Sequence, residues 1–472
     1  MTFHDVFDEI ERDRPMLERM AREIWESPEL GLHEERSAAL LREALADEGF
    51  DLEVGVGGMP TAFIATYGEG DATVGILGEY DALPGLSQRV CAERDPVEEG
   101  EPGHGCGHNL FGVAGVGAAL GVKRQIEGGD LDGTIKFFGC PAEETLVGKV
   151  FMARAGAFDD LDVALTWHPG DVSTPRFGRT LAMDSVQFRY EGVSAHASVS
   201  PESGRSALDA VSLLNTGVEY AREHLPDSTR IHYVITDGGD APNVVPSSAT
   251  VWYYVRAPTR GEVEFATDWV GDIAAGAARM TRTDLTRRAV TGCWDYLPNR
   301  VVTDAIWETM TELGEIEFAD EDRAFAEELQ GTLAETQLER SLEDIPDEHA
   351  RAMSQDPLYG VPVPVYDEDS ISGGSTDVGD VSWIVPTGQF RAATWPVGTP
   401  AHSWQAVAAN GDFGIEGGIY AAKVLAGTAI LLLENPSRLE RAQATFRDST
   451  GDRSYESPVD ADAEPPFDIT AG

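Results

Sequence analysis

The sequence predicts an α/β protein: a main domain with a mostly parallel sheet and helices on both faces, plus a smaller inserted domain of α+β type. Three observations lead to this prediction. In the first 180 residues, short apolar runs alternate with helical stretches, which is typical of parallel sheets. The next part follows the order β-α-β-β-α-β, the split unit of ferredoxin-like domains. With 472 residues, the chain is long enough for two or three cores.

The main domain begins with helices between about residues 3 and 49, where Leu17, Met20 and Ile24 recur at helical spacing. Strands are then expected at Thr61–Tyr67, Thr73–Leu77, Thr134–Phe138 and Val163–Trp167. The apolar, glycine-rich segment Leu110–Val122 lies between the second and third of these strands and predicts a buried helix.

The inserted domain begins at a half-exposed strand, in which Val186, Phe188 and Tyr190 alternate with polar residues. Five further elements complete this domain, in the order helix, strand, strand, helix and strand. They are expected at Gly204–His224, near Arg230–Thr236, near Thr250–Arg256, at Gly261–Met280 and near Leu285–Thr291. We therefore place this lid or dimerisation domain at 181–297 and the discontinuous catalytic domain at 1–180 and 298–435.

Three further segments complete the chain. The acidic residues 318–368 predict an insertion or helical excursion. A helix at about Gly414–Leu433 is expected to close the main core. Residues 436–472 are polar and acidic, and they predict a flexible tail.

The charge balance points to a saline environment. The chain carries 35 Lys+Arg against 82 Asp+Glu, a net charge of −47 spread along its whole length. Such self-repulsion destabilises a compact state unless salt screens it, so we expect a protein from a halophile. We do not expect nucleic acid or anionic membrane surfaces as partners, because they carry the same sign of charge as the protein.

Other features favour a cytoplasmic protein. The four cysteines are too few and too dispersed for a disulfide framework. Residues 1–16 are acidic and lack the layout of a signal peptide. The longest apolar run, Val424–Leu433, is too short to span a bilayer.

A Cys and a His lie two residues apart in the glycine-rich segment Gly103–Asn109. On an extended segment, Cys106 and His108 would point to the same side and could share a metal ion. One alternative is a buried Cys beside a structural His. The other is a Cys106 nucleophile with His108 as its base, which leaves the residues described next without a role.

Further candidate ligands stand where apolar runs end, which is where α/β folds place their sites. Glu143 and Glu144 follow the strand predicted at Thr134–Phe138, so one carboxylate can bind a metal while its neighbour handles a proton. His168 closes the strand at Val163–Trp167, and His402 lies in a polar loop. Each histidine is a weak signal alone, and the set together predicts a metal centre.

Five segments resemble, in order, those of the two-domain metallo-aminoacylase and carboxypeptidase G-like amidohydrolase family. They are Gly78–Gly85, Gly105–Asn109, Pro141–Glu144, Ala157–Pro169 and Gly374–Trp383. The resemblance runs from near residue 25 to about residue 430, and within the family it points to the aminobenzoyl-glutamate utilization protein B branch.

The resemblance implies a dinuclear metal centre, a base and a substrate site. The ligands that it implies are Cys106, His108, Glu144, His168 and His402. Glu143 matches the general base. His196 matches a residue that polarises the substrate carbonyl, usually from the partner subunit, which implies a homodimer formed through the inserted domain. Asn243 and Arg256 match positions that hold the substrate's backbone and carboxylate, a role suited to the planar fork of Arg.

Two positions depart from the pattern of many peptidase relatives. Glu79 stands where they carry a metal-ligating His, two residues before Asp81, and Asn109 stands where they carry a bridging Asp. The resemblance to the amidohydrolase branch implies that Cys106 serves as a soft ligand in place of these two residues. Two divalent ions are therefore still expected. A mixed Cys/His/Glu set fits Zn, Mn or Co.

We therefore expect a metal-dependent amidohydrolase that cleaves an N-acyl or N-aroyl amino acid, such as aminobenzoyl-glutamate. Glu143 would act as base and His196 would stabilise the oxyanion. Two alternatives remain open: a metallo-dipeptidase of the same family, and a non-catalytic subunit that supports a related chain in a hetero-oligomer. The intact Glu143 argues against the second.

Overall fold

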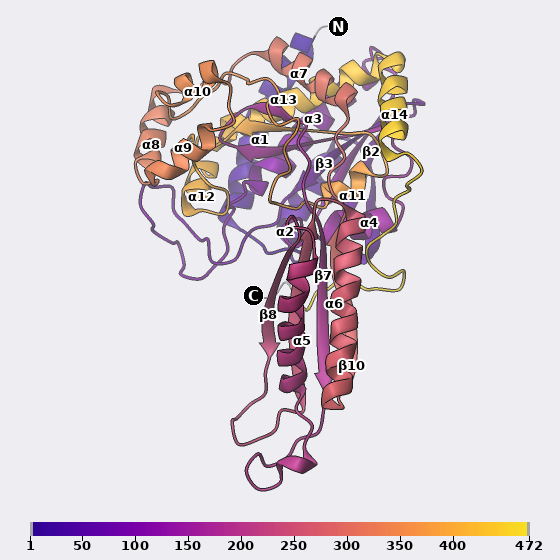
Figure 1. Ribbon diagram of the computed structural model, residues 1–472. Coiled ribbons are helices and arrows are strands. Elements are labelled where there is room, and N and C mark those ends of the chain that lie inside the picture. The colour runs from indigo at the N-terminus through magenta and orange to yellow at the C-terminus, as the bar shows by residue number, and fades with distance from the viewer. Residues whose placement is uncertain (1–2, 470–472) are drawn as a thin grey trace.

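The computed structural model describes residues 3–469, which form a broad body and a narrow domain projecting from it (Figure 1). A seven-stranded sheet crosses the body in the order β1-β2-β4-β3-β5-β11-β6. Its strands are β1 (Asp51–Val54), β2 (Phe63–Tyr67), β3 (Thr73–Glu79), β4 (Thr134–Cys140), β5 (Val163–Gly170), β6 (Thr174–Arg176) and β11 (Thr387–Ala393). The four central strands are mutually parallel and the outer pairings are antiparallel, which confirms the mostly parallel sheet.

Helices cover both faces of this sheet. One face packs against α1 (Phe3–Glu26), α2 (Glu35–Asp47), α3 (His108–Glu127), α7 (Arg300–Leu313) and α13 (Gly414–Leu433), and the other against α4 (Gly148–Arg154) and α11 (Val378–Ser382). Because successive side chains of a strand point to opposite faces, Phe137 of β4 enters the first core and Phe138 the second.

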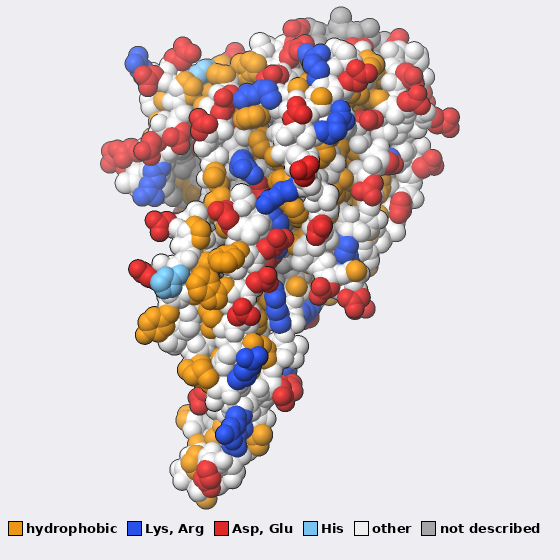
Figure 2. All heavy atoms as spheres, turned by 45° about the vertical axis from the view of Figure 1, so that its right-hand side comes forward, with side chains coloured by type: hydrophobic (Ala, Val, Ile, Leu, Met, Phe, Trp, Pro, Cys, Tyr) orange, Lys and Arg blue, Asp and Glu red, His pale blue; other side chains and the backbone are white. Residues whose placement is uncertain are grey.

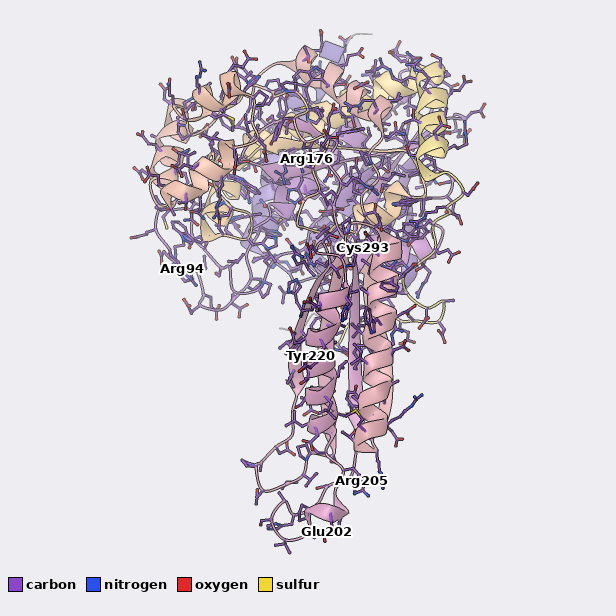
Figure 3. All side chains as sticks on the ribbon, viewed as in Figure 1. Arg94, Arg176, Glu202, Arg205, Tyr220 and Cys293 are labelled. Carbon is purple, nitrogen blue, oxygen red and sulfur yellow. The ribbon has the colours of Figure 1, made fainter. Side chains whose placement is uncertain are left out.

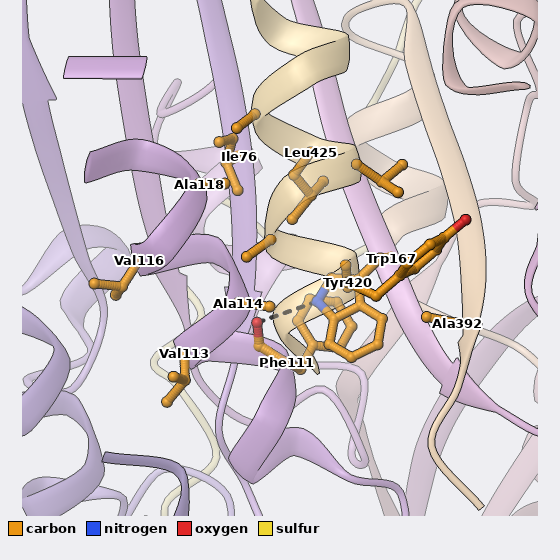
Figure 4. Packing of buried hydrophobic residues seen from close by; sticks show 14 of the residues in the cluster. Ile76, Phe111, Val113, Ala114, Val116, Ala118, Trp167, Ala392, Tyr420 and Leu425 are labelled. Carbon is orange, nitrogen blue, oxygen red and sulfur yellow. Dashed lines mark hydrogen bonds between the residues drawn. The ribbon is translucent and has the colours of Figure 1, made fainter. Parts of the chain in front are cut away.

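Helices α3 and α13 lie side by side at the centre of the first core (Figure 4). The indole of Trp167 anchors β5 to α3 by donating a hydrogen bond to the backbone carbonyl of Phe111, 3.2 Å away. Within the described residues, α13 alone is long and apolar enough to cross a membrane, but most of it is buried inside the body, as in a core helix.

The projecting domain follows the predicted order β-α-β-β-α-β. Its elements are β7 (Ala182–Glu191), α5 (Ala207–Ala221), β8 (Arg230–Asp237), β9 (Ser248–Ala257), α6 (Arg260–Thr281) and β10 (Asp284–Cys293). The antiparallel sheet has the order β10-β7-β9-β8, and α5 and α6 pack together against one of its faces. A capping box fixes the start of α6, since Thr259 and Glu262 bond reciprocally to each other's backbone.

The acidic segment after α7 forms the helical excursion that the sequence predicted. It contains α8 (Asp320–Gln330), α9 (Glu335–Leu342) and α10 (Asp347–Met353). Ile345 and Met353 pack with Val172 and Val397 in a small separate core. The excursion therefore packs against the two loops that follow β5 and β11, which lie at the carboxyl ends of these parallel strands.

The expectation of a flexible tail after residue 435 is wrong for much of that segment. Helix α14 (Pro436–Thr450) packs on α7 and α13 and buries Leu439 and Ala442. Asn435 caps it and Pro436 opens it, a helix-start signal that polar composition obscured. Beyond it, the Tyr455 hydroxyl donates to Asp380 over 2.9 Å. Residues 470–472 of the expected tail lie outside the described residues.

Candidate metal centre and active site

Cys106 and His108 meet at the start of a helix. The prediction of an extended segment is wrong here: His108 is the first residue of α3, and Gly107 before it has a φ of +74°. A Cβ on Gly107 would lie 2.8 Å from the Pro169 ring, so glycine permits both the turn and the close approach of β5. As a result, Cys106 Sγ lies 3.4 Å from Nε2 of His168.

A buried carboxylate orients His108. Nδ1 of His108 lies 2.9 Å from Oδ1 of Asp81, and the other carboxylate oxygen of Asp81 accepts a hydrogen bond from the Glu144 backbone N–H, also over 2.9 Å. Asp81 therefore ties the ring of one candidate ligand to the backbone of another. Such a partner fixes the tautomer of a ligating imidazole and leaves Nε2 to face a metal.

Glu143 and Glu144 occupy the turn that follows β4, where the apolar strand was predicted to deliver them. Glu144 lies 3.2 Å from Nε2 of His402, and Glu143 lies 4.0 Å from Nε2 of His108. The His402 backbone N–H donates to Gly105 O over 2.9 Å, which holds the His402 loop against the loop of Cys106.

The five candidate ligands converge. One group joins Cys106, His108 and His168, another joins Cys106, Glu144 and His402, and in each the ligand atoms lie within 4.8 Å of one another. A thiol, imidazoles and a carboxylate form a donor set suited to borderline-soft divalent ions. Two of its buried atoms, His108 Nε2 and Glu144 Oε1, have no hydrogen-bond partner among the described residues. The residues present therefore fit a dinuclear transition-metal site.

A buried ion network lies beside this set, and the sequence analysis missed it. The Lys149 ammonium is fully buried between Glu79, at 2.7 Å, and Asp377, at 2.6 Å. Glu79 also lies 3.3 Å from Nε2 of His108. One signal was available, because Lys149 is one of only four lysines in an arginine-rich chain.

Asn109, the second departure from the family pattern, is occupied elsewhere. Its side-chain amide donates to backbone carbonyls of Ala21 in α1 and Asn410 in α12 (Trp404–Asn410), at 3.3 and 3.1 Å. It therefore ties three helices together behind the ligand set.

Burial and neighbouring charges set the protonation of these groups. Burial, together with the carboxylates of Glu79 and Glu144, raises the pKa of Glu143 well above its usual value. Burial, together with the positive charge of the His108 ring, lowers the pKa of His168 to about 3. This imidazole is therefore neutral and can bind a metal ion. Burial also raises the pKa of the Cys106 thiol, which argues against Cys106 as an unassisted nucleophile.

A cavity of about 320 Å³ opens beside these residues. Its wall combines Cys106, Glu143, Glu144, His168 and His402 of the body with Tyr254 and Arg256 of the inserted domain. Arg256 Nε has no hydrogen-bond partner within the described part of the chain, so its guanidinium is available to a ligand. The structure thus brings Arg256 to the predicted site.

His196 and Asn243 are not brought to it. Both residues are exposed, and each lies on a loop of the inserted domain. The two loops pair with each other: His196 and Val244 form a β-bridge, and the Ala197 N–H donates to the Asn243 carbonyl over 2.9 Å. The loop carrying His196 continues to Glu202 and Arg205, which lie at the far end of the inserted domain (Figure 3). Within one chain, these two residues are separated from the metal ligands.

Comparisons with known proteins agree with this architecture. A family model described as a peptidase dimerisation domain matches residues 183–279. The chain is 41% identical to a p-aminobenzoyl-glutamate hydrolase subunit of Escherichia coli (strain K12), over 97% of both chains. It is 29% identical to the Xaa-Arg dipeptidase of Mus musculus, over 93% of this chain and 91% of that one. It shares its fold with a dinuclear metal binding peptidase of the M20 family from Bacillus subtilis, with a TM-score of 0.54 and 17% identity, over 90% and 99% of the two chains.

Proposed function

Since this chain belongs to the M20 family of metallopeptidases and amidohydrolases, we propose that it hydrolyses the amide bond of N-aroyl or N-acyl amino acids of the p-aminobenzoyl-glutamate type. The observation that carries the proposal is the convergence of five ligand side chains around a cavity that also contains Glu143 and Arg256.

Five residues would hold the metal ions: Cys106, His108, Glu144, His168 and His402. Zinc, manganese and cobalt are the candidate elements. When bound, divalent ions polarise a carbonyl and lower the pKa of water in the site. Position 109 offers no carboxylate to such ions, because the Asn109 amide donates to backbone carbonyls of α1 and α12.

The chain's own residues move the proton and hold the substrate. Glu143 accepts a proton from the attacking water and delivers it to the leaving amine as the C–N bond breaks. Arg256 holds the substrate's α-carboxylate through its planar fork. His196 and Asn243 complete the site from the partner subunit, with His196 donating to the developing oxyanion.

We propose that the partner is a second copy, paired through the inserted domain. Strand β8 is one of the two edge strands of the four-stranded sheet and exposes Tyr233, Val234 and Ile235, which makes it suited to pairing with another strand. Figure 2 shows hydrophobic side chains gathered on the projecting domain, with charged side chains among them. Hetero-oligomerisation with a related chain is the second arrangement that this edge permits.

Turnover by the purified protein tests the function. In molar KCl with added Zn, Mn or Co, the protein is expected to hydrolyse p-aminobenzoyl-glutamate faster than dipeptides with a free amine. Glu143→Gln is expected to retain the metal and lose several orders of magnitude in kcat, because it removes only the proton acceptor. Glu144→Ala is its matched contrast and is expected to lose metal by elemental analysis. No hydrolysis by any metal-loaded form, or full activity in Glu143→Gln, would contradict the proposal.

A further inference from the structure

A row of polar side chains leads outward from the ligand set. In the parallel pair of β5 and β11, His168 lies opposite Arg391, and in the antiparallel pair of β11 and β6, Gln389 lies opposite Arg176. Directly paired residues share a face of the sheet, as do residues two apart on a strand. His168, Arg391, Gln389 and Arg176 therefore point to the same side, and all four line the cavity beside the ligands.

The two arginines of this row differ in their ion pairing. Arg176 pairs with Asp367, with 2.9 Å between Nε and Oδ2. Arg391 forms no ion pair with any residue in the described range 3–469. Burial and the charge of Arg391 together lower the pKa of Arg176, so the two guanidinium groups act on each other. The carboxyl of Asp171 also feels the charge of both arginines, but it forms no direct ion pair with Arg391, so the Arg391 guanidinium stays open to a ligand.

A second cavity, of about 710 Å³, continues from this point. It shares Arg176, Ser372 and Arg391 with the first cavity. The rest of its wall contains Arg340 and the four acidic residues Asp344, Asp367, Glu368 and Asp369. Figure 3 shows Arg176 inside the body, well away from the tip of the inserted domain. A substrate bound at the ligands therefore has room to extend a side chain toward Arg391.

We propose that Arg391, supported by Arg176 and Gln389, forms a subsite for a second carboxylate, and that the preferred substrates are N-acyl amino acids with an acidic side chain. This inference rests on the proposed function and names its substrate class. Arg391 supplies the unpaired planar fork that a carboxylate needs, while Gln389 adds an amide donor.

The test compares two substrates that differ in one charge, p-aminobenzoyl-glutamate and p-aminobenzoyl-glutamine, in wild type and Arg391→Gln. The wild type is expected to prefer the glutamate compound. In Arg391→Gln, the ratio of the two kcat/KM values should fall on the order of tenfold to a hundredfold, mainly through KM, as for a lost charge-assisted hydrogen bond. Arg391→Lys, which keeps the charge without the fork, should recover part of the ratio. Arg447→Gln, the same charge change on the exposed face of α14, should leave it unchanged.

Binding provides a readout independent of turnover. Calorimetry with analogues in which a methylene replaces the amide carbonyl should show the same loss of glutamate-over-glutamine preference in Arg391→Gln. Equal rates for the two substrates in the wild type, or an equal fall for both in Arg391→Gln, would overturn the subsite and leave the hydrolase function standing. If no compound is hydrolysed, the proposed function fails, and the calorimetric preference still decides the subsite. If Arg391→Gln does not fold, the wild-type preference and Arg391→Lys decide it.

Discussion

Nδ1 of His108 lies 2.9 Å from the carboxylate of Asp81, and neither side chain is exposed to solvent. Burial lowers the pKa of His108, but the Asp81 charge outweighs it and raises that pKa well above its usual value. The contact explains why the first helical residue of α3 presents Nε2, and not Nδ1, toward Cys106, Glu143 and His168.

Asp81→Asn should therefore weaken metal binding without removing a ligand. We expect metal affinity to fall about 10- to 100-fold, as for other partners of ligating histidines. Competition with a chelator of known affinity measures it. Asp71→Asn, an exposed carboxylate just before β3, is the control for the loss of one negative charge. Unchanged affinity in Asp81→Asn would show that the His108 ring needs no such orientation.

Mixing two inactive variants tests the shared active site. Homodimers of Glu143→Gln and of His196→Ala should each be nearly inactive, because every site in them lacks one group. Reassembled heterodimers contain one site with both groups intact, so about half of the wild-type activity per heterodimer should return. A pull-down with two different tags confirms that chains have exchanged. If exchange is confirmed and activity stays absent, His196 does not act across the interface.

The buried ammonium of Lys149 should be important for stability. Lys149→Met leaves Glu79 and Asp377 as uncompensated buried carboxylates and should lower the free energy of unfolding by about 3–5 kcal/mol. Denaturant unfolding of the metal-free protein at constant salt measures it. Lys136→Met is the matched control: its partner Asp160 is exposed, and loss of such a pair costs about 0–1 kcal/mol. Equal effects of the two substitutions would contradict the prediction.

Asp380 should make stability depend on pH. Burial raises its pKa to about 8, against 3.8 for an unperturbed Asp. Between these values the folded form holds a proton that the unfolded form has lost, so this contribution to stability is full below pH 4 and is lost as pH rises through 8. From pH 5 to 9, wild type should lose roughly 4 kcal/mol relative to Asp380→Asn. Unfolding curves at fixed salt measure the difference, and parallel pH profiles would refute it.

Salt should stabilise the folded chain. A net charge of −47 repels itself over a Debye length of about 10 Å at 0.1 M salt, which shrinks to about 3 Å at 1 M. We therefore expect the Tm to rise steeply with KCl or NaCl, in keeping with a proposed origin in a high-salt cytoplasm. Sucrose at matched osmolality is the control, because it leaves charge unscreened. A Tm indifferent to salt would argue against halophilic adaptation.

The sequence by itself determined the features that depend on neighbours along the chain. Short apolar runs located β2 to β5, because strands buried on both faces are apolar throughout. Apolar alternation marked the first strand of the β-α-β-β-α-β unit, because burial on one face imposes a period on the sequence. The same periods placed Glu143 and His168 at strand ends, where a parallel sheet exposes them together. Composition determined the charge, since counting needs no geometry.

Tertiary structure alone decided which distant residues meet. Lys149 and Asp377 are 228 positions apart, and nothing local in either segment predicts their contact. Strand β11 went unrecognised because Gln389 and Arg391 interrupt its apolar pattern, yet it pairs with β5 and places Arg391 beside His168. Parallel strands are joined by long connections, so the register of their pairing cannot be predicted from a short stretch of sequence. The separation of His196 from Glu143 is likewise set by the length of the inserted domain, which only the folded chain reveals.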